Sequence, residues 1–145
     1  MKDKPDHHDA ELVLKLYDLR RETVMRESRN SINAKFWPKN YDEFLAVASD
    51  IKHPMNAAWR QVSTYWEMAY SFARHGVVNA DFFAENCGEG LFFFAKIKPY
   101  LEQYRKDIAP TAFTNSSWLV ANSGIARTRM ELLESRVKTM LESMK

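Results

Sequence analysis

Apolar side chains recur every three to four residues along most of the chain, which is the spacing of one face of an α-helix. No stretch alternates apolar and polar residues over the length of a strand. We therefore expect an all-α, single-domain helical bundle of about five to seven helices, with residues 1–8 as a flexible N-terminus. The predicted helices cover residues 10–28, 41–50, 55–75, a short stretch after Asn79, a segment from Leu91 that contains Pro99, a turn of helix around Trp118, and residues 126–145.

The predicted helix over residues 55–75 has the widest apolar face, an arc of about 200° that includes Trp59 and Trp66. We expect it at the centre of the bundle, ended by Gly76 in a left-handed conformation. Its remaining stripe carries Arg60, Glu67 and Arg74, which are seven residues apart and so face the same way. This polar stripe needs a polar partner.

Glu67 is the strongest candidate for a functional polar residue, because it lies in the middle of the most apolar helix. We expect it to form a structural ion pair with an arginine from a neighbouring helix, such as Arg105. The alternative is a ligand or acid–base site formed by Arg60, Glu67 and Arg74, which would need a second ionisable group across a pocket.

The second half of the chain contains a proline and two close glycines. Gly88 and Gly90 predict a turn, and Pro99 predicts a helix that either bends near Lys96 or restarts. The last helix carries a narrow apolar seam at steps of three and four residues, which is typical of a helix that pairs with another helix. The seam residues are Met130, Leu133, Val137, Met140 and Met144.

The chain has 145 residues, 46% of them apolar, and a net charge of +2. One core can form at this length without disulfides or metals. The balanced charge gives little attraction for nucleic acid, and no apolar run approaches the roughly 20 residues that cross a bilayer. We therefore expect no nucleic-acid partner and no integral membrane segment. Because the chain has one cysteine, Cys87, and a charged N-terminus in place of a signal sequence, we also expect a cytoplasmic protein.

Candidate chemistry is sparse. No His, Cys and carboxylate spacing fits a metal site, and we expect neither a metal nor a cofactor. Cys87 lies between two glutamates that oppose its ionisation, which favours an inert, packed thiol. The basic residues of the first helix scatter around its wheel, and we expect them to form a solvated face. They are Arg20, Arg21, Arg26 and Arg29.

Several stretches between residues 58 and 107 combine an aromatic–Glu pair, a helix ended by glycine, a short capped helix, and a proline followed by arginine. They are Tyr65–Ala69, Arg74–Phe82, Lys98–Tyr100 and Arg105. This arrangement resembles a small bacterial family of helical proteins, domain of unknown function 4760. The resemblance implies a helical fold and no assigned activity, so no catalytic residue is transferred from it.

Two functions remain open on the sequence. The first is a non-enzymatic protein-interaction module that forms a homodimer, or docks another protein, through the seam of the last helix, unless that seam packs on its own bundle. The second is a small-molecule binding protein or enzyme with a pocket between the helix over residues 55–75 and the proline-containing helix, where Glu67 or Arg74 reaches a polar ligand.

Overall fold

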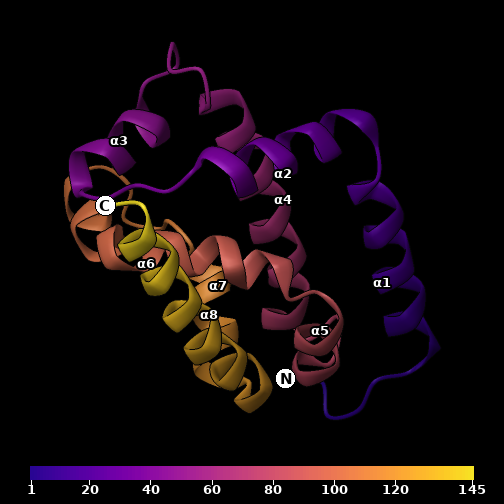
Figure 1. The fold of residues 1–145 in the computed structure, drawn as a ribbon. Helices are drawn as coiled ribbons and strands as arrows, with labels where there is room; N and C mark the ends of the chain where they lie inside the picture. Colours follow the sequence, from indigo (N-terminus) through magenta and orange to yellow (C-terminus); the bar gives the residue numbers. More distant parts are fainter.

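The computed structural model describes residues 1–145 and contains eight α-helices and no strand (Figure 1). The expected all-α, single-domain bundle is confirmed, with one helix more than the upper end of the predicted range. The helices are α1 (His7–Arg20), α2 (Thr23–Lys35), α3 (Tyr41–Ser49), α4 (Asn56–Arg74), α5 (Ala80–Asn86), α6 (Glu89–Asp107), α7 (Thr114–Asn122) and α8 (Gly124–Ser143).

The first predicted helix is wrong in extent, because it is divided into α1 and α2. Glu22 adopts an extended backbone, with φ −58° and ψ 143°, and its side chain accepts a hydrogen bond from the Met25 amide. The carboxylate thereby caps a second helix. Helix α1 also starts earlier than predicted, because the cap is Asp6, which accepts from the amides of His8 and Asp9.

The central position of α4 is confirmed (Figure 1). Trp59 and Trp66 are 5% and 2% exposed, and α4 packs against α2, α3, α5 and α7. Gly76 follows the helix with φ 75°, the left-handed conformation that glycine adopts without steric cost. The predicted aromatic face is therefore the core of the molecule.

Helix α6 differs from its prediction at Gly90, whereas at Pro99 it is one continuous helix, which was one of the two predicted alternatives. It begins at Glu89, so Gly90 lies inside the helix rather than in a turn, and it continues through Pro99 without restarting. Gly90 packs directly on the Trp66 ring and the Tyr70 hydroxyl of α4, and a Cβ at this position would lie less than 3.0 Å from both. The absence of a side chain at Gly90 thus sets how closely α6 approaches α4.

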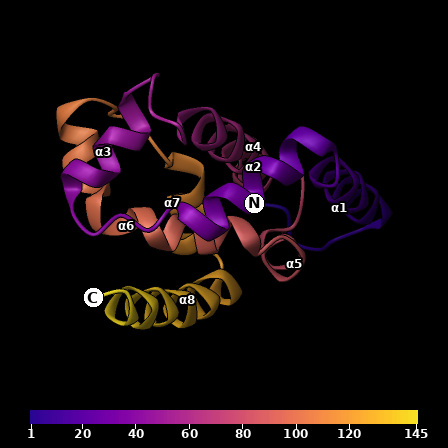
Figure 2. The same cartoon turned by 45° about the horizontal axis from the view of Figure 1, so that its top comes forward.

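Helix α8 lies at one edge of the bundle, alongside α6 (Figure 2). It also contacts α5 and α7, and one residue, Ser123, connects it to α7. None of the eight helices combines the length and the apolar content that a bilayer span requires.

Candidate functional site

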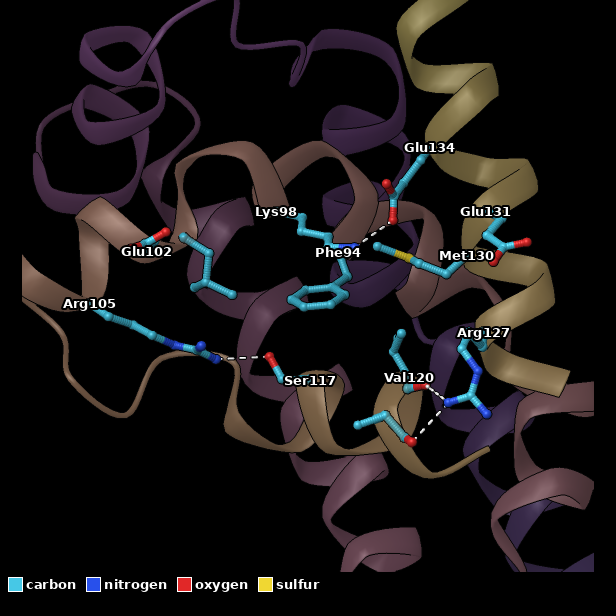
Figure 3. A pocket seen from close by; sticks show the side chains of 12 residues that line it. Phe94, Lys98, Glu102, Arg105, Ser117, Val120, Arg127, Met130, Glu131 and Glu134 are labelled. Atoms are coloured by element: carbon cyan, nitrogen blue, oxygen red, sulfur yellow. Dashed lines mark hydrogen bonds and ion pairs between the residues drawn. The ribbon is translucent and has the colours of Figure 1, made fainter. Parts of the chain in front are cut away.

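A groove of about 690 Å³ lies between α6, α7 and α8 (Figure 3). Its apolar floor consists of Phe94, Leu101, Val120 and Met130. Helix α8 forms one wall and α6 the other, so residues far apart in the sequence line it. We call it the α6–α8 groove. The sequence did not predict it.

Charged side chains of both signs surround the floor. Lys98 Nζ donates to Glu134 Oε1 at 2.8 Å, which links the two walls. Arg105 donates to the Ala112 carbonyl and to Ser117 Oγ, both at 2.8 Å. Arg127 Nη1 donates to the Ala121 carbonyl at 2.9 Å, near the C-terminal end of α7. The two arginines thus lie on the α7 side of the groove (Figure 3).

Two further hollows flank α8. One, of about 460 Å³, continues beyond the Lys98–Glu134 pair and is lined by Pro99, Val137 and Leu141 among others. The other, of about 400 Å³, lies where Leu132 of α8 faces the start of α6. Both hollows are open at the surface, so they are grooves along the edges of α8.

The seam of α8 is divided between the interior and the surface. Met130 and Val137 are buried in the core of the same chain, and Leu133 is partly buried. Met140 and Met144 are 40% and 37% exposed. The first part of the seam therefore packs on the chain's own bundle, which was the alternative to a dimer seam, and the last part has no partner in the chain.

The polar stripe of α4 does not form one cluster. Arg60 Nε donates to Asn56 Oδ1 at 2.9 Å, within α4 itself. Arg74 Nη1 donates to Asn115 Oδ1 at 3.3 Å, and the Asn115 amide in turn donates to Glu67. Glu67 and Arg74 thus meet at α7, whereas Arg60 does not take part.

The expected arginine partner of Glu67 is wrong. Its carboxylate accepts from the amide of Asn115 at 3.0 Å, from the amide of Ser116 at 2.9 Å, and from the Ser116 hydroxyl. These amides belong to the first turn of α7, where the preceding residue, Phe113, provides no side-chain cap. A carboxylate is favourable there because the free N–H groups of a helix N-terminus carry partial positive charge.

A small hollow of about 290 Å³ lies beside Glu67 and is also lined by Trp59, Tyr104 and Phe113. Arg74 is not among its lining residues. A hollow is therefore present between α4 and the proline-containing helix, but it is small and does not include Arg74. Both carboxylate oxygens of Glu67 are already hydrogen-bonded.

Glu89 is the partner of two arginines that were expected to be solvated. Arg29 Nε and Nη2 donate to its two oxygens at 2.9 and 2.7 Å, and Arg20 Nη1 donates at 3.3 Å. The prediction of a solvated face is wrong for these two residues. A bidentate arginine on a carboxylate at the start of α6 fixes α1 and α2 to that helix.

Cys87 is buried, and burial raises the pKa of its thiol to about 11. A thiol with such a pKa is almost entirely protonated at neutral pH, so it is a poor nucleophile. No group of three His, Cys, Asp or Glu side chains is placed to hold a metal ion.

Lys96 is a buried charge that the sequence analysis missed. Only 3% of it is exposed, its Nζ donates to the Ile32 carbonyl at 3.2 Å, and the same atom lies 3.9 Å from the centre of the Trp37 ring. Burial lowers its pKa to about 8. The uninterrupted apolar run of residues 91–95 immediately before it was the signal that could have indicated its burial.

The low pKa of Lys96 makes a prediction about pH. Below about pH 8 the ammonium is charged in both states, and its burial costs the folded state about 3 kcal/mol. Between the folded pKa and the unfolded value, the unfolded chain binds more protons, so stability rises with pH. The free energy of unfolding of the wild type, relative to Lys96→Met, is expected to increase by about 2 kcal/mol from about pH 7 to about pH 9.5, measured by urea unfolding.

Lys106→Met is the matched control, because Lys106 is an exposed lysine of the same helix. Its stability difference from the wild type should not change over this pH range. A Lys96→Met curve that runs parallel to the wild-type curve would show that Lys96 keeps an ordinary pKa.

The comparisons with known proteins place the chain in a family. The model of domain of unknown function 4760 (DUF4760) matches residues 5–123. No curated protein and no solved structure matches significantly. The resemblance in residues 58–107 is confirmed, and the match extends further, over α1 to α7. The chain therefore belongs to the DUF4760 family, and α8 is the helix that lies beyond the matched residues.

Proposed function

We propose that this protein is a non-enzymatic helical interaction module that associates with a second copy of itself through α8. The observation that carries the proposal is the division of the α8 apolar residues between the interior and the surface. Leu132, Met140 and Met144 are 68%, 40% and 37% exposed, whereas Met130 and Val137 of the same helix are buried. Exposed apolar side chains gathered on one element are typical of a surface that binds another protein.

The packing of α8 supports this assignment. Three of its 20 residues are buried, compared with eight of the 19 in α4. Hollows lie on both flanks of the helix, and it is the one helix outside the family match. A long helix held at the edge of a domain by so few buried residues is a natural element for contact with a partner.

The polar side chains with potential chemistry support a non-enzymatic role. The carboxylates of Glu67 and Glu89 each hold structural elements together, and Cys87 is buried and protonated. As part of the same proposal the module works in the cytoplasm, since a single buried thiol suits a reducing compartment.

The alternative of a small-molecule site at Glu67 and Arg74 has less support from the geometry. Of these two residues, only Glu67 lines the hollow there, and its carboxylate oxygens already accept three hydrogen bonds. A ligand would have to compete with the first turn of α7 for the same carboxylate. Association through α8 requires no such loss.

The mass of the full chain in solution tests the proposed function. Light scattering on a sizing column, over two decades of protein concentration, is expected to give twice the 17.0 kDa of one chain at the upper concentrations. Hydrogen exchange of the α8 amides should slow over the same range, while that of the α1 amides stays constant. A chain that keeps the mass of a monomer throughout would contradict self-association.

A further inference from the structure

Helix α8 turns one row of side chains away from its buried residues. We call this row the outer face of α8. It runs at steps of three and four residues, the spacing of a helix that pairs with a second helix, and consists of Ile125, Thr128, Leu132, Ser135 and Thr139. Four of the five are exposed, and Leu132 at the centre is 68% exposed. Because α8 is the outermost helix on one side of the molecule, a second molecule can approach this row (Figure 2).

Opposite charges lie on the two flanks of the outer face. Glu131 is on the flank that borders the α6–α8 groove (Figure 3), and Arg136 is on the flank that borders the hollow of about 400 Å³ near the start of α6. Neither side chain forms an ion pair within the chain, whereas the neighbouring Glu134 is already paired with Lys98. Two unpaired charges of opposite sign therefore lie on either side of an exposed leucine.

We propose that a second copy covers the outer face of α8, with the two α8 helices parallel and related by a two-fold axis. This inference rests on the proposed function and specifies the surface and the orientation of the contact. Glu131 and Arg136 are five residues apart, the separation of the two flanking positions that face each other across a parallel helix pair. Glu131 therefore meets Arg136 of the second copy, and the symmetry forms this ion pair twice. Leu132 packs on Leu132 of the second copy between the two pairs.

The antiparallel orientation is less favourable for the same side chains. It brings equal flanks together, so Glu131 would meet Lys138 of the second copy, but Arg129 would lie opposite Arg136. Two arginines in contact repel each other. The parallel pair retains an ion pair on each side of the seam and places no like charges opposite each other.

The fold is compatible with a parallel pair. Met130 and Val137 anchor the opposite side of α8 in the chain's own core, so the helix is already formed before it pairs. These buried sides point in opposite directions across the pair, which keeps the two bundles apart. Met140 and Met144 extend the Arg136 flank toward the bundle, so Leu132 is the main apolar contact. A contact with so little apolar surface gives a weak dimer.

Charge reversal at Arg136 distinguishes the two orientations. In the parallel pair, Arg136→Glu sets two carboxylates against each other on both sides of the seam. We expect the Kd of the dimer to rise about tenfold, a value suited to two exposed ion pairs. In an antiparallel pair, the same variant would replace the contact between two arginines by an ion pair and lower the Kd. Light scattering on a sizing column over a range of concentrations measures both changes.

Two further variants complete the experiment. Lys138→Glu is the matched control, because Lys138 is an exposed basic residue of the same helix that meets no charge in the parallel pair. Its Kd should equal that of the wild type. Glu131→Arg alone should weaken the dimer as much as Arg136→Glu does. An equal mixture of these two variants should recover the wild-type Kd, because every contact between the flanks then joins opposite charges.

The outcomes separate this inference from the proposed function. A lower Kd for Arg136→Glu, or a higher Kd for Lys138→Glu, would overturn the parallel orientation. An unchanged Kd in all three variants would overturn the use of the outer face. In these cases a wild-type dimer with slowed exchange of the α8 amides would still support the proposed function. A wild-type chain that stays monomeric would overturn the proposed function and this inference together.

Discussion

Replacing Gly90 by alanine is expected to lower the free energy of unfolding by about 3 kcal/mol, at the upper end of what overpacking a core costs. The added Cβ would lie 2.5 Å from Tyr70 Oη and 2.6 Å from Trp66 Cδ2. Both aromatic side chains are fully enclosed in the core, so neither can move aside without opening the contact between α4 and α6. Urea unfolding measures the loss, and the melting temperature should fall by roughly 6 to 12 °C.

Gly124→Ala is the matched control, because Gly124 is also a helical glycine but has open space around the position of its Cβ. Alanine is the better helix former, so this variant should be unchanged or stabilised by up to about 1 kcal/mol. If Gly90→Ala unfolds at the same urea concentration as Gly124→Ala, this result would contradict the claim that α6 packs too closely on α4 at Gly90 to accept a side chain.

The packing of Gly90 against α4 could not be predicted from the sequence. Two glycines separated by one residue are typical of a turn, and the local pattern holds no information to the contrary. Its packing role depends on Trp66 and Tyr70, which lie about twenty residues earlier in the chain. A close approach of two helices is a property of their tertiary arrangement, so the turn was predicted where a helix begins.

Local sequence signals were sufficient to predict the ends of a helix where a capping residue or a glycine marks them. Asn40 caps α3 at the predicted start of that helix, Asn79 caps α5, the short helix predicted after it, and Gly76 has the expected left-handed backbone. The start of α2 was missed because Glu22 is its cap, and glutamate is not a preferred capping residue. A break without Gly, Pro or a preferred cap leaves the apolar periodicity almost undisturbed.

Polar partners were the least predictable part of the candidate site. The sequence showed that Glu67 needed a partner but suggested a side chain of opposite charge. Two of the actual donors are backbone amides of α7, which every non-proline residue possesses and which residue type does not reveal, and the third is the Ser116 hydroxyl. The pairing of Glu89 with Arg20 and Arg29 spans sixty or more residues and depends on the division between α1 and α2, which the sequence did not show.

Glu67→Ala is expected to lower the free energy of unfolding by about 2 kcal/mol, because it leaves the first turn of α7 without its cap. The carboxylate accepts from the amides of Asn115 and Ser116, and Phe113 provides no replacement. The loss should appear first at α7. In hydrogen exchange, the amides of Asn115 and Ser116 should therefore exchange faster in this variant than in the wild type.

Glu102→Ala provides the control, since Glu102 is an exposed glutamate within α6. This variant should change stability by less than about 0.5 kcal/mol, as expected for a surface substitution, and leave the exchange of Asn115 and Ser116 unaltered. Glu67→Gln should fall between the two, because one amide oxygen remains as an acceptor but without the charge that favours the helix N-terminus. Equal exchange at Asn115 and Ser116 in all four proteins would contradict the capping role, since it would show that another group satisfies those amides.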